Sequence, residues 1–230
     1  MTIGELKSSE SGLGAVLDDK IVTYVFFEMF THESAPYYKA YIQEDDRSAG
    51  MAVLFPVSGG TCPDVTNRVS VVGSLVIHDN EATLIAADWT VDDTTYQLPK
   101  PLAMSQASLG GTTTNQPALY SAGGACNVAL RVRVFGRVDW SDSYGVPGVD
   151  ALAYVDDGTG IDDGSGVRGV RVILVADPVQ GVGAGDYVAA TGVLTVELVD
   201  PDGQPNSDDE YYAYAIRTTV PEDWDVLTEP

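Results

Sequence analysis

Apolar and polar residues alternate over most of the chain, and this pattern predicts β-strands with almost no helix. From Lys20 onward the period is two, β-branched and aromatic residues dominate, and turn-forming residues recur at short spacing. Segment 4–17, ahead of the first strand, is a modest candidate for a helix or turn, and residues 105–109 could make one helical turn. The predicted strands are 19–29, 37–44, 50–55, 68–77 and 82–89, then 128–139, 150–156, 168–175, 186–198 and 210–218. The fold class is therefore all-β.

The second half of the chain repeats the strand order of the first. Tyr41 and Tyr154 lie in matching second strands, and Gly73 and Gly192 interrupt matching long fourth strands. The spacing between copies grows from 113 residues at the tyrosines to 119 at the glycines. A solenoid repeat is far shorter, roughly 20 to 50 residues. The pattern indicates a duplicated domain.

A stretch rich in proline, glycine and threonine separates the halves. Proline fixes φ and lacks an amide donor, and the pair Gly110-Gly111 loosens the chain, so this stretch is predicted to be a linker. The predicted boundaries are a first barrel over 1–97, a linker over 98–127 and a second barrel over 128–230.

Five strands with a glycine in the long fourth one close naturally as a small Greek-key barrel. The order of the strands around Lys20, Tyr41, Gly73 and Ile85 resembles the OB-fold domains repeated in large bacterial secreted or cell-surface proteins. The second half matches at 132–138, 154–166, 188–194 and 215–218. The resemblance implies two tandem five-stranded OB-like Greek-key barrels. It leaves function open, because this fold hosts oligonucleotide-binding, oligosaccharide-binding, protein-binding and structural roles.

The chain is strongly acidic. Lys and Arg number 12 against 34 Asp and Glu, so the formal net charge is −22, and both halves share the excess. Such a field repels polyanions, whereas phosphate-binding proteins draw most of their non-specific affinity from Lys and Arg. The charge therefore disfavours nucleic acid as a partner.

The compartment is inferred from composition. No run of 18 or more apolar residues occurs, so no membrane span is expected, and segment 1–7 lacks the basic start and apolar stretch of a signal peptide. An acidic, lysine-poor β-protein rich in Thr and Gly is typical of the exterior of the cell. We expect a soluble protein that is extracellular or located at the cell surface, with any signal peptide already removed.

The two cysteines, Cys62 and Cys126, both lie in glycine-containing loop sequences. One interpretation is a disulfide that ties a loop of the first half to the entry of the second and constrains the unfolded chain. The other is two unrelated thiols. The sequence leaves both open.

An aspartate- and glycine-rich run between two predicted strands is a candidate calcium site. Its candidate ligands are Asp156, Asp157, Asp162 and Asp163. Calcium prefers several carboxylate and carbonyl oxygens on a flexible loop, although this spacing does not fit an EF-hand. The alternative is a solvated turn in which the aspartates cap backbone amides. A second acidic loop, at 200–210, is read as a solvated insertion.

Three arginines on one predicted strand form a second candidate site. Arg131, Arg133 and Arg137 share a face, because residues two apart on a strand point the same way. With Tyr154 and Tyr187 they could make a stacking platform for single-stranded nucleic acid. The alternative, which the domain charge favours, is an exposed face balanced by the surrounding acids.

Tyrosine-rich strands supply candidate interface residues. These are Tyr37, Tyr38, Tyr211, Tyr212 and Tyr214. Alternate tyrosines on a strand place one ring in the core and the next outside, and exposed aromatic rows mark sugar platforms or protein interfaces. Tyrosine is also simply a good strand residue.

Catalysis has little support. The chain has two histidines, and no nucleophile elbow, zinc-protease motif, phosphate loop or Cys-x-x-Cys occurs. We predict no enzymatic activity and no cofactor other than the candidate calcium. The primary prediction is a structural, self-assembling subunit of a filament or tube, with head-to-tail contacts between copies. The second is a module that binds an oligosaccharide or a partner protein, and the third is a single-stranded nucleic-acid binder.

Overall fold

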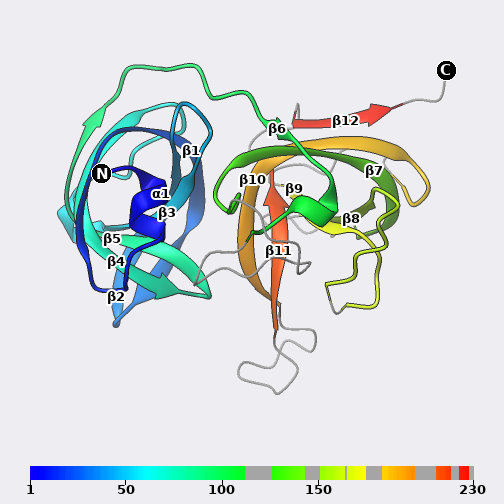
Figure 1. The fold of residues 1–230 in the computed structure, drawn as a ribbon, viewed down its shortest axis with the longest axis horizontal. Helices are drawn as coiled ribbons and strands as arrows, with labels where there is room; N and C mark the ends of the chain where they lie inside the picture. The colour runs from blue at the N-terminus through cyan, green and yellow to red at the C-terminus, as the bar shows by residue number, and fades with distance from the viewer. Residues whose placement is uncertain are drawn as a thin grey trace. The chain divides into compact units, whose positions relative to one another are not determined.

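The computed structural model describes residues 1–111, 126–142, 151–163, 165–174, 183–199, 211–218 and 223–227. These residues form two compact units (Figure 1). Residues 1–100 and 126–130 belong to the first unit, and 101–111 together with the described residues from 131 onward belong to the second. No helix among the described residues is long and apolar enough to cross a membrane.

The first unit is a closed five-stranded barrel. Its strands are β1 (Gly14–His32), β2 (Ala35–Gln43), β3 (Gly50–Pro56), β4 (Arg68–His78) and β5 (Glu81–Asp92). Their order around the barrel is β1-β2-β3-β5-β4, with a parallel pairing between β3 and β5 and antiparallel pairings elsewhere. This is the Greek-key closure expected of an OB-like barrel. A 3₁₀ turn, η1 (Val57–Gly59), follows β3.

A short helix, α1 (Ile3–Lys7), packs against this barrel. Thr2 and Glu5 form a reciprocal capping box at its start, which satisfies two amides that a helix end leaves unpaired. Ile3 and Leu6 are fully buried and belong to the core cluster of the barrel. The predicted helix candidate was longer, and the helix stops early because serines and Gly12 follow Lys7.

The second unit repeats the barrel with two additional strands. Its strands are β6 (Leu102–Ala103), β7 (Arg131–Asp142), β8 (Ala151–Asp156), β9 (Val170–Leu174), β10 (Tyr187–Val199), β11 (Tyr211–Arg217) and β12 (Trp224–Leu227). The pairings run β7-β8-β9-β11-β10 and return from β10 to β7, which closes the same order as in the first unit. Strand β6 has no counterpart among the strands of the first barrel, and β12 is separate from β11. The predicted fold class, two tandem OB-like barrels, is confirmed.

The two barrels agree in detail as well as in order. Each first strand carries an irregularity at the same place, between Val22 and Tyr24 in β1 and between Val138 and Trp140 in β7. The paired glycines also allow the same close approach of strands, because a Cβ on Gly73 would overlap the carbonyl of Ile85, and one on Gly192 would overlap that of Arg217. These glycines are therefore required by strand packing.

The barrels differ in how the last strand is built. In the first unit β5 is continuous, and Trp89 lies opposite Val71 of β4. In the second unit the corresponding tryptophan is Trp224, opposite Ala190 of β10, and it lies on the separate strand β12. Strands β11 and β12 together thus replace the single strand β5 (Figure 1).

Much of the described part of the predicted linker is built into the two units. A 3₁₀ turn, η2 (Gln106–Ser108), packs on the second unit: the amide of Gln106 donates to Asp157 Oδ2 at 2.8 Å, and its side-chain Nε2 donates to the carbonyl of Val155. Just after the predicted linker, the carbonyl of Val128 accepts a 3.1 Å hydrogen bond from the buried Lys7 Nζ, which also donates to the carbonyl of Gly50 at 3.1 Å within the first unit. Residues 112–125 lie outside the described part of the chain.

Candidate functional site

Strand β7 turns its valines into the core and its arginines to the opposite face. Val132, Val134 and Val138 are buried, with at most 1% of each side chain exposed. The alternate residues, Arg131, Arg133, Phe135 and Arg137, share the other face because side chains on a strand alternate.

The neighbouring strands bring further residues to this face. Tyr187 of β10 lies directly opposite Arg137, and the same tyrosine lies opposite Leu227 of β12 on its other side. Directly paired residues point to the same side of a sheet. Figure 1 shows β12 running along β10, which also pairs with β7. We call this surface the β7 platform, defined as Arg133, Phe135, Arg137, Tyr187 and Leu227.

Large apolar side chains of the platform are exposed. Phe135 is 44% exposed, Tyr187 50% and Leu227 43%. Phe135 and Tyr187 sit in adjacent rows, since Phe135 pairs with Ala189, two residues from Tyr187. Aromatic side chains bury large areas when they find a partner, so two neighbouring exposed rings form a surface suited to stacking.

The arginines of this face differ in their pairing. Arg131 Nη2 lies 2.8 Å from Asp223 Oδ1 in a pair that is largely buried. Arg133 Nη2 lies 2.5 Å from Asp225 Oδ2, and its guanidinium carbon is 5.5 Å from the centre of the Phe135 ring. Arg137 donates to the backbone carbonyl of Gly185 at 3.3 Å, and among the described residues no carboxylate lies within ion-pair distance of it. Arg137 thus offers an exposed guanidinium beside the rings.

The structure brings most of the predicted platform together and removes one member. Tyr154 is buried within the unit, where its hydroxyl accepts a 2.6 Å hydrogen bond from Arg171 Nε, and burial raises its pKa. Its counterpart Tyr41 donates to Glu81 Oε2 at 2.8 Å. Sequence reasoning missed Phe135 and Leu227. The alternation of residues along β7 indicates that Phe135 shares the face of the arginines, whereas Leu227 lies on strand β12, which was not predicted.

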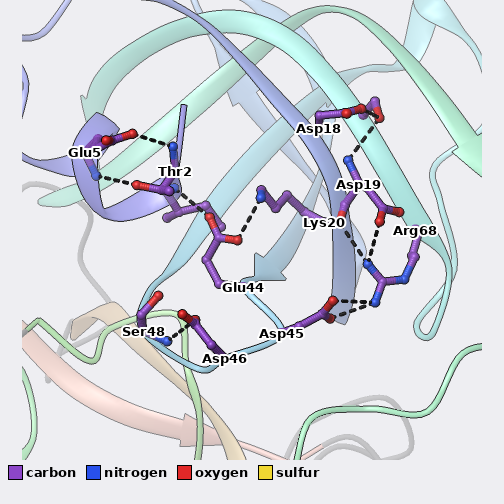
Figure 2. A network of polar contacts seen from close by, with 12 residues as sticks. Thr2, Glu5, Asp18, Asp19, Lys20, Glu44, Asp45, Asp46, Ser48 and Arg68 are labelled. Carbon is purple, nitrogen blue, oxygen red and sulfur yellow. Dashed lines mark hydrogen bonds and ion pairs between the residues drawn. The ribbon is translucent and has the colours of Figure 1, made fainter.

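On the corresponding face of the first unit, the arginine is paired with carboxylates. Arg68, 119 residues before Tyr187, makes a bidentate pair with Asp45 at 2.7 and 2.8 Å and a further pair with Asp19 at 3.1 Å. Figure 2 shows this network, together with the 2.7 Å pair between Lys20 and Glu44. A guanidinium with two carboxylate partners has little capacity left for an anion. The duplicated barrels therefore offer different surfaces at one matching place.

An aromatic cluster near the hairpin ends of the first barrel is also internally satisfied. Lys39 Nζ lies 5.3 to 5.4 Å from the ring centres of Phe26, Phe30 and Tyr41 and 3.1 Å from Glu81 Oε2. Both members of the ion pair are buried. This cation is neutralised inside the unit and is not available to a ligand.

The aspartates of the predicted calcium site mostly cap backbone amides. Asp156 accepts from Gly158, Asp157 from Thr159 and Asp162 from Gly166, while Asp163 pairs with Arg171 at 2.8 Å. Such contacts are those of the turn interpretation. Within the described ranges, no three His, Cys, Asp or Glu side chains converge to hold a metal ion. Calcium binding by these residues stays a prediction.

The predicted interface tyrosines occupy different environments. Tyr38 packs against the core cluster of the first barrel, whereas Tyr37 on the other face is half-buried beside His32. Tyr214 is buried and Tyr212 is 44% exposed. The side chain of Tyr211 and the acidic loop 200–210 lie outside the described residues.

Cys62 and Cys126 are thiols in the structure, so the interpretation as a disulfide is not realised there. Cys62 is partly buried and Cys126 buried. Burial, with a smaller contribution from the nearby Asp64, raises the pKa of Cys62 to about 11. A protonated thiol is a poor partner for disulfide exchange, because the thiolate is the nucleophile.

No protein-family model matches the chain, and no curated protein matches it. Among solved structures, a murine DNA-binding protein bound to double-stranded DNA is 11% identical with a TM-score of 0.32, covering 89% of this chain and 99% of that one. The single-stranded DNA-binding protein from Thermus aquaticus is 10% identical with a TM-score of 0.29, covering 96% and 97%. A replication protein A heterotrimer bound to single-stranded DNA is 8% identical with a TM-score of 0.30, covering 100% and 52%.

These structural neighbours contradict several sequence-based predictions. All three are described as DNA-binding proteins or as bound to DNA. The predictions of an extracellular or cell-surface location, of a self-assembling structural role with head-to-tail partners, and of a chain that avoids nucleic acid were wrong. They rested on overall composition and on the duplication, and neither specifies a compartment or a partner.

Proposed function

We propose that this protein binds single-stranded nucleic acid, without catalysis, through the β7 platform. The observation that carries the proposal is the combination of two exposed rings in adjacent rows with an arginine that lacks a carboxylate partner among the described residues. Sequence-tolerant binders of single strands use the same combination, with rings for the bases and cations for the backbone.

Stacking supplies most of the proposed affinity. Each base stacked on an aromatic side chain contributes about 1 to 3 kcal/mol, as judged by alanine substitution. Phe135 and Tyr187 provide two such positions, and Arg133 and Arg137 flank them. A duplex hides the faces of its bases, so the platform favours a single strand.

The net charge of −22 opposes binding at low ionic strength. Exposed charges more than a Debye length apart are largely screened, and this length is about 8 Å at physiological salt. Repulsion from the rest of the acidic surface is therefore weakened at a strand seated on the platform, while stacking does not depend on charge. The proposed binding is thus weakly salt-dependent.

Substitutions at Tyr187 and Arg137 test the proposal. We expect Tyr187→Ala to weaken binding of a fluorescently labelled oligo(dT) about five- to a hundredfold, the equivalent of losing one stacked base. Arg137→Gln should weaken it by a smaller factor and make its salt dependence shallower. Fluorescence anisotropy at several salt concentrations measures both effects.

Matched controls separate the platform from general effects. Tyr212→Ala removes a ring of similar exposure from β11, and Arg47→Gln removes one charge from an exposed turn of the first unit. Both should leave affinity unchanged. Equal losses in the control and platform variants, with all of them folded, would contradict the assignment of this surface.

A further inference from the structure

Strand β12 places two carboxylates against the arginines of β7. Asp223, immediately before the strand, pairs with Arg131, and Asp225 within it pairs with Arg133. The two pairs differ in exposure. The Asp223 side chain is 6% exposed, whereas that of Asp225 is 52% exposed and its partner Arg133 is 29% exposed.

The exposed pair occupies the place where a backbone phosphate would bind. Arg133 also donates to Thr191 Oγ1 at 3.0 Å and lies near the Phe135 ring, so its guanidinium is held at the edge of the stacking surface. A carboxylate and a phosphate compete for the same planar donor group of an arginine. Asp225 therefore competes for the Arg133 guanidinium with any anion that approaches the rings.

The separate origin of β12 distinguishes this arrangement from the first barrel. There, the corresponding stretch is the continuous end of β5, whereas β12 pairs with β10 over four residues, Tyr187 to Ala190. Its anchors are the buried Trp224 and the buried pair of Asp223 with Arg131. Asp225 can release Arg133 while these anchors keep the strand in place.

We infer that Asp225 is a built-in competitor for the backbone phosphate, which holds Arg133 until a nucleic-acid strand displaces it. This inference rests on the proposed function of the β7 platform. A strand that displaces Asp225 gains the contact of one phosphate with Arg133 and returns a carboxylate to water. The loss of the ion pair between Asp225 and Arg133 partly cancels the free energy gained from the phosphate contact. The Asp225 carboxylate therefore lowers the affinity for nucleic acid and reduces the salt dependence of binding.

The variant Asp225→Asn tests the inference. It leaves Arg133 without its competitor, so we expect oligo(dT) to bind about three- to tenfold more tightly at low salt. The slope of log K against log salt should become more negative by about 0.7, the value for one additional phosphate contact on a single strand. Asp93→Asn is the matched control, because it makes the same change in charge at an exposed residue of the first unit.

The outcomes separate this inference from the proposed function. A gain in affinity and slope for Asp225→Asn but not for Asp93→Asn supports it. If both variants behave alike while Tyr187→Ala still loses binding, the platform is correct and the competitor role is wrong. If the unsubstituted protein binds no oligo(dT) at any salt concentration, the proposed function itself fails. Thermal unfolding of each variant confirms that the fold is kept.

Discussion

At the scale of single residues, the repeated glycines are fixed by strand packing. A methyl group on Gly192 would overlap the carbonyl of Arg217, and one on Gly73 would overlap that of Ile85. We expect Gly192→Ala and Gly73→Ala each to lower the free energy of unfolding by about 1 to 3 kcal/mol, the usual cost of overpacking. Gly14→Ala, where nothing lies within 4 Å of the added carbon, should leave it nearly unchanged. Urea denaturation measures all three, and equal stability of all variants would contradict this account.

The thiol of Cys62 gives a second test at this scale. Its pKa of about 11 lies well above the ordinary value near 8.5, so at pH 8 only about one thiol in a thousand is ionised. In a Cys126→Ala background, the rate of alkylation by iodoacetamide should rise about tenfold per pH unit between pH 8 and pH 10. A plateau that begins near pH 8.5 would show that burial does not suppress the thiolate.

At the scale of elements, the alternation of apolar residues predicted the ten barrel strands closely, because a half-buried strand must keep its apolar residues on one face. Alternation also places Arg131, Arg133 and Arg137 on one face of their strand. It could not find β12, which has four residues and joins β10 through tertiary pairing. Nor could it show that Tyr154 is buried, because burial of an individual ring depends on the elements packed against it.

The turn η2 belongs to the element scale as well, since its sequence predicted one helical turn but placed it inside a linker. Gln106 is fully buried and bonds to Asp157 and Val155 of the second unit. We expect Gln106→Ala to destabilise that unit by about 0.5 to 1.5 kcal/mol, because it removes the buried hydrogen bond from Gln106 Nε2 to the carbonyl of Val155. Differential scanning calorimetry should show this loss of stability as a lower midpoint temperature in one of two unfolding transitions. The matched control is Gln97→Ala, at the exposed residue just before the predicted linker, and it should leave both transitions unchanged. Equal stability of the two variants would support the interpretation of this stretch as a passive linker.

At the scale of the whole molecule, the net charge does not describe the local surfaces that a partner would meet. The value of −22 is a sum over surfaces that differ, as the matching faces of the two barrels show. In the first unit Arg68 is bound by two carboxylates, whereas in the second Arg137 stands beside exposed rings. All six cations after residue 130 are arginines, and three of them lie on β7. Local arrangement, not the sum, decides where an anion can bind.

The most direct test of the central claim compares single-stranded with double-stranded DNA. The unsubstituted protein would be titrated into a labelled oligo(dT) and into a duplex of the same length, with fluorescence anisotropy as the measurement. Because the β7 platform stacks on bases that a duplex conceals, we predict saturable binding of the single strand, at least about tenfold tighter than of the duplex, with a shallow dependence on salt. Absence of binding to oligo(dT) across the salt range, or equal affinity for the two forms, would contradict it.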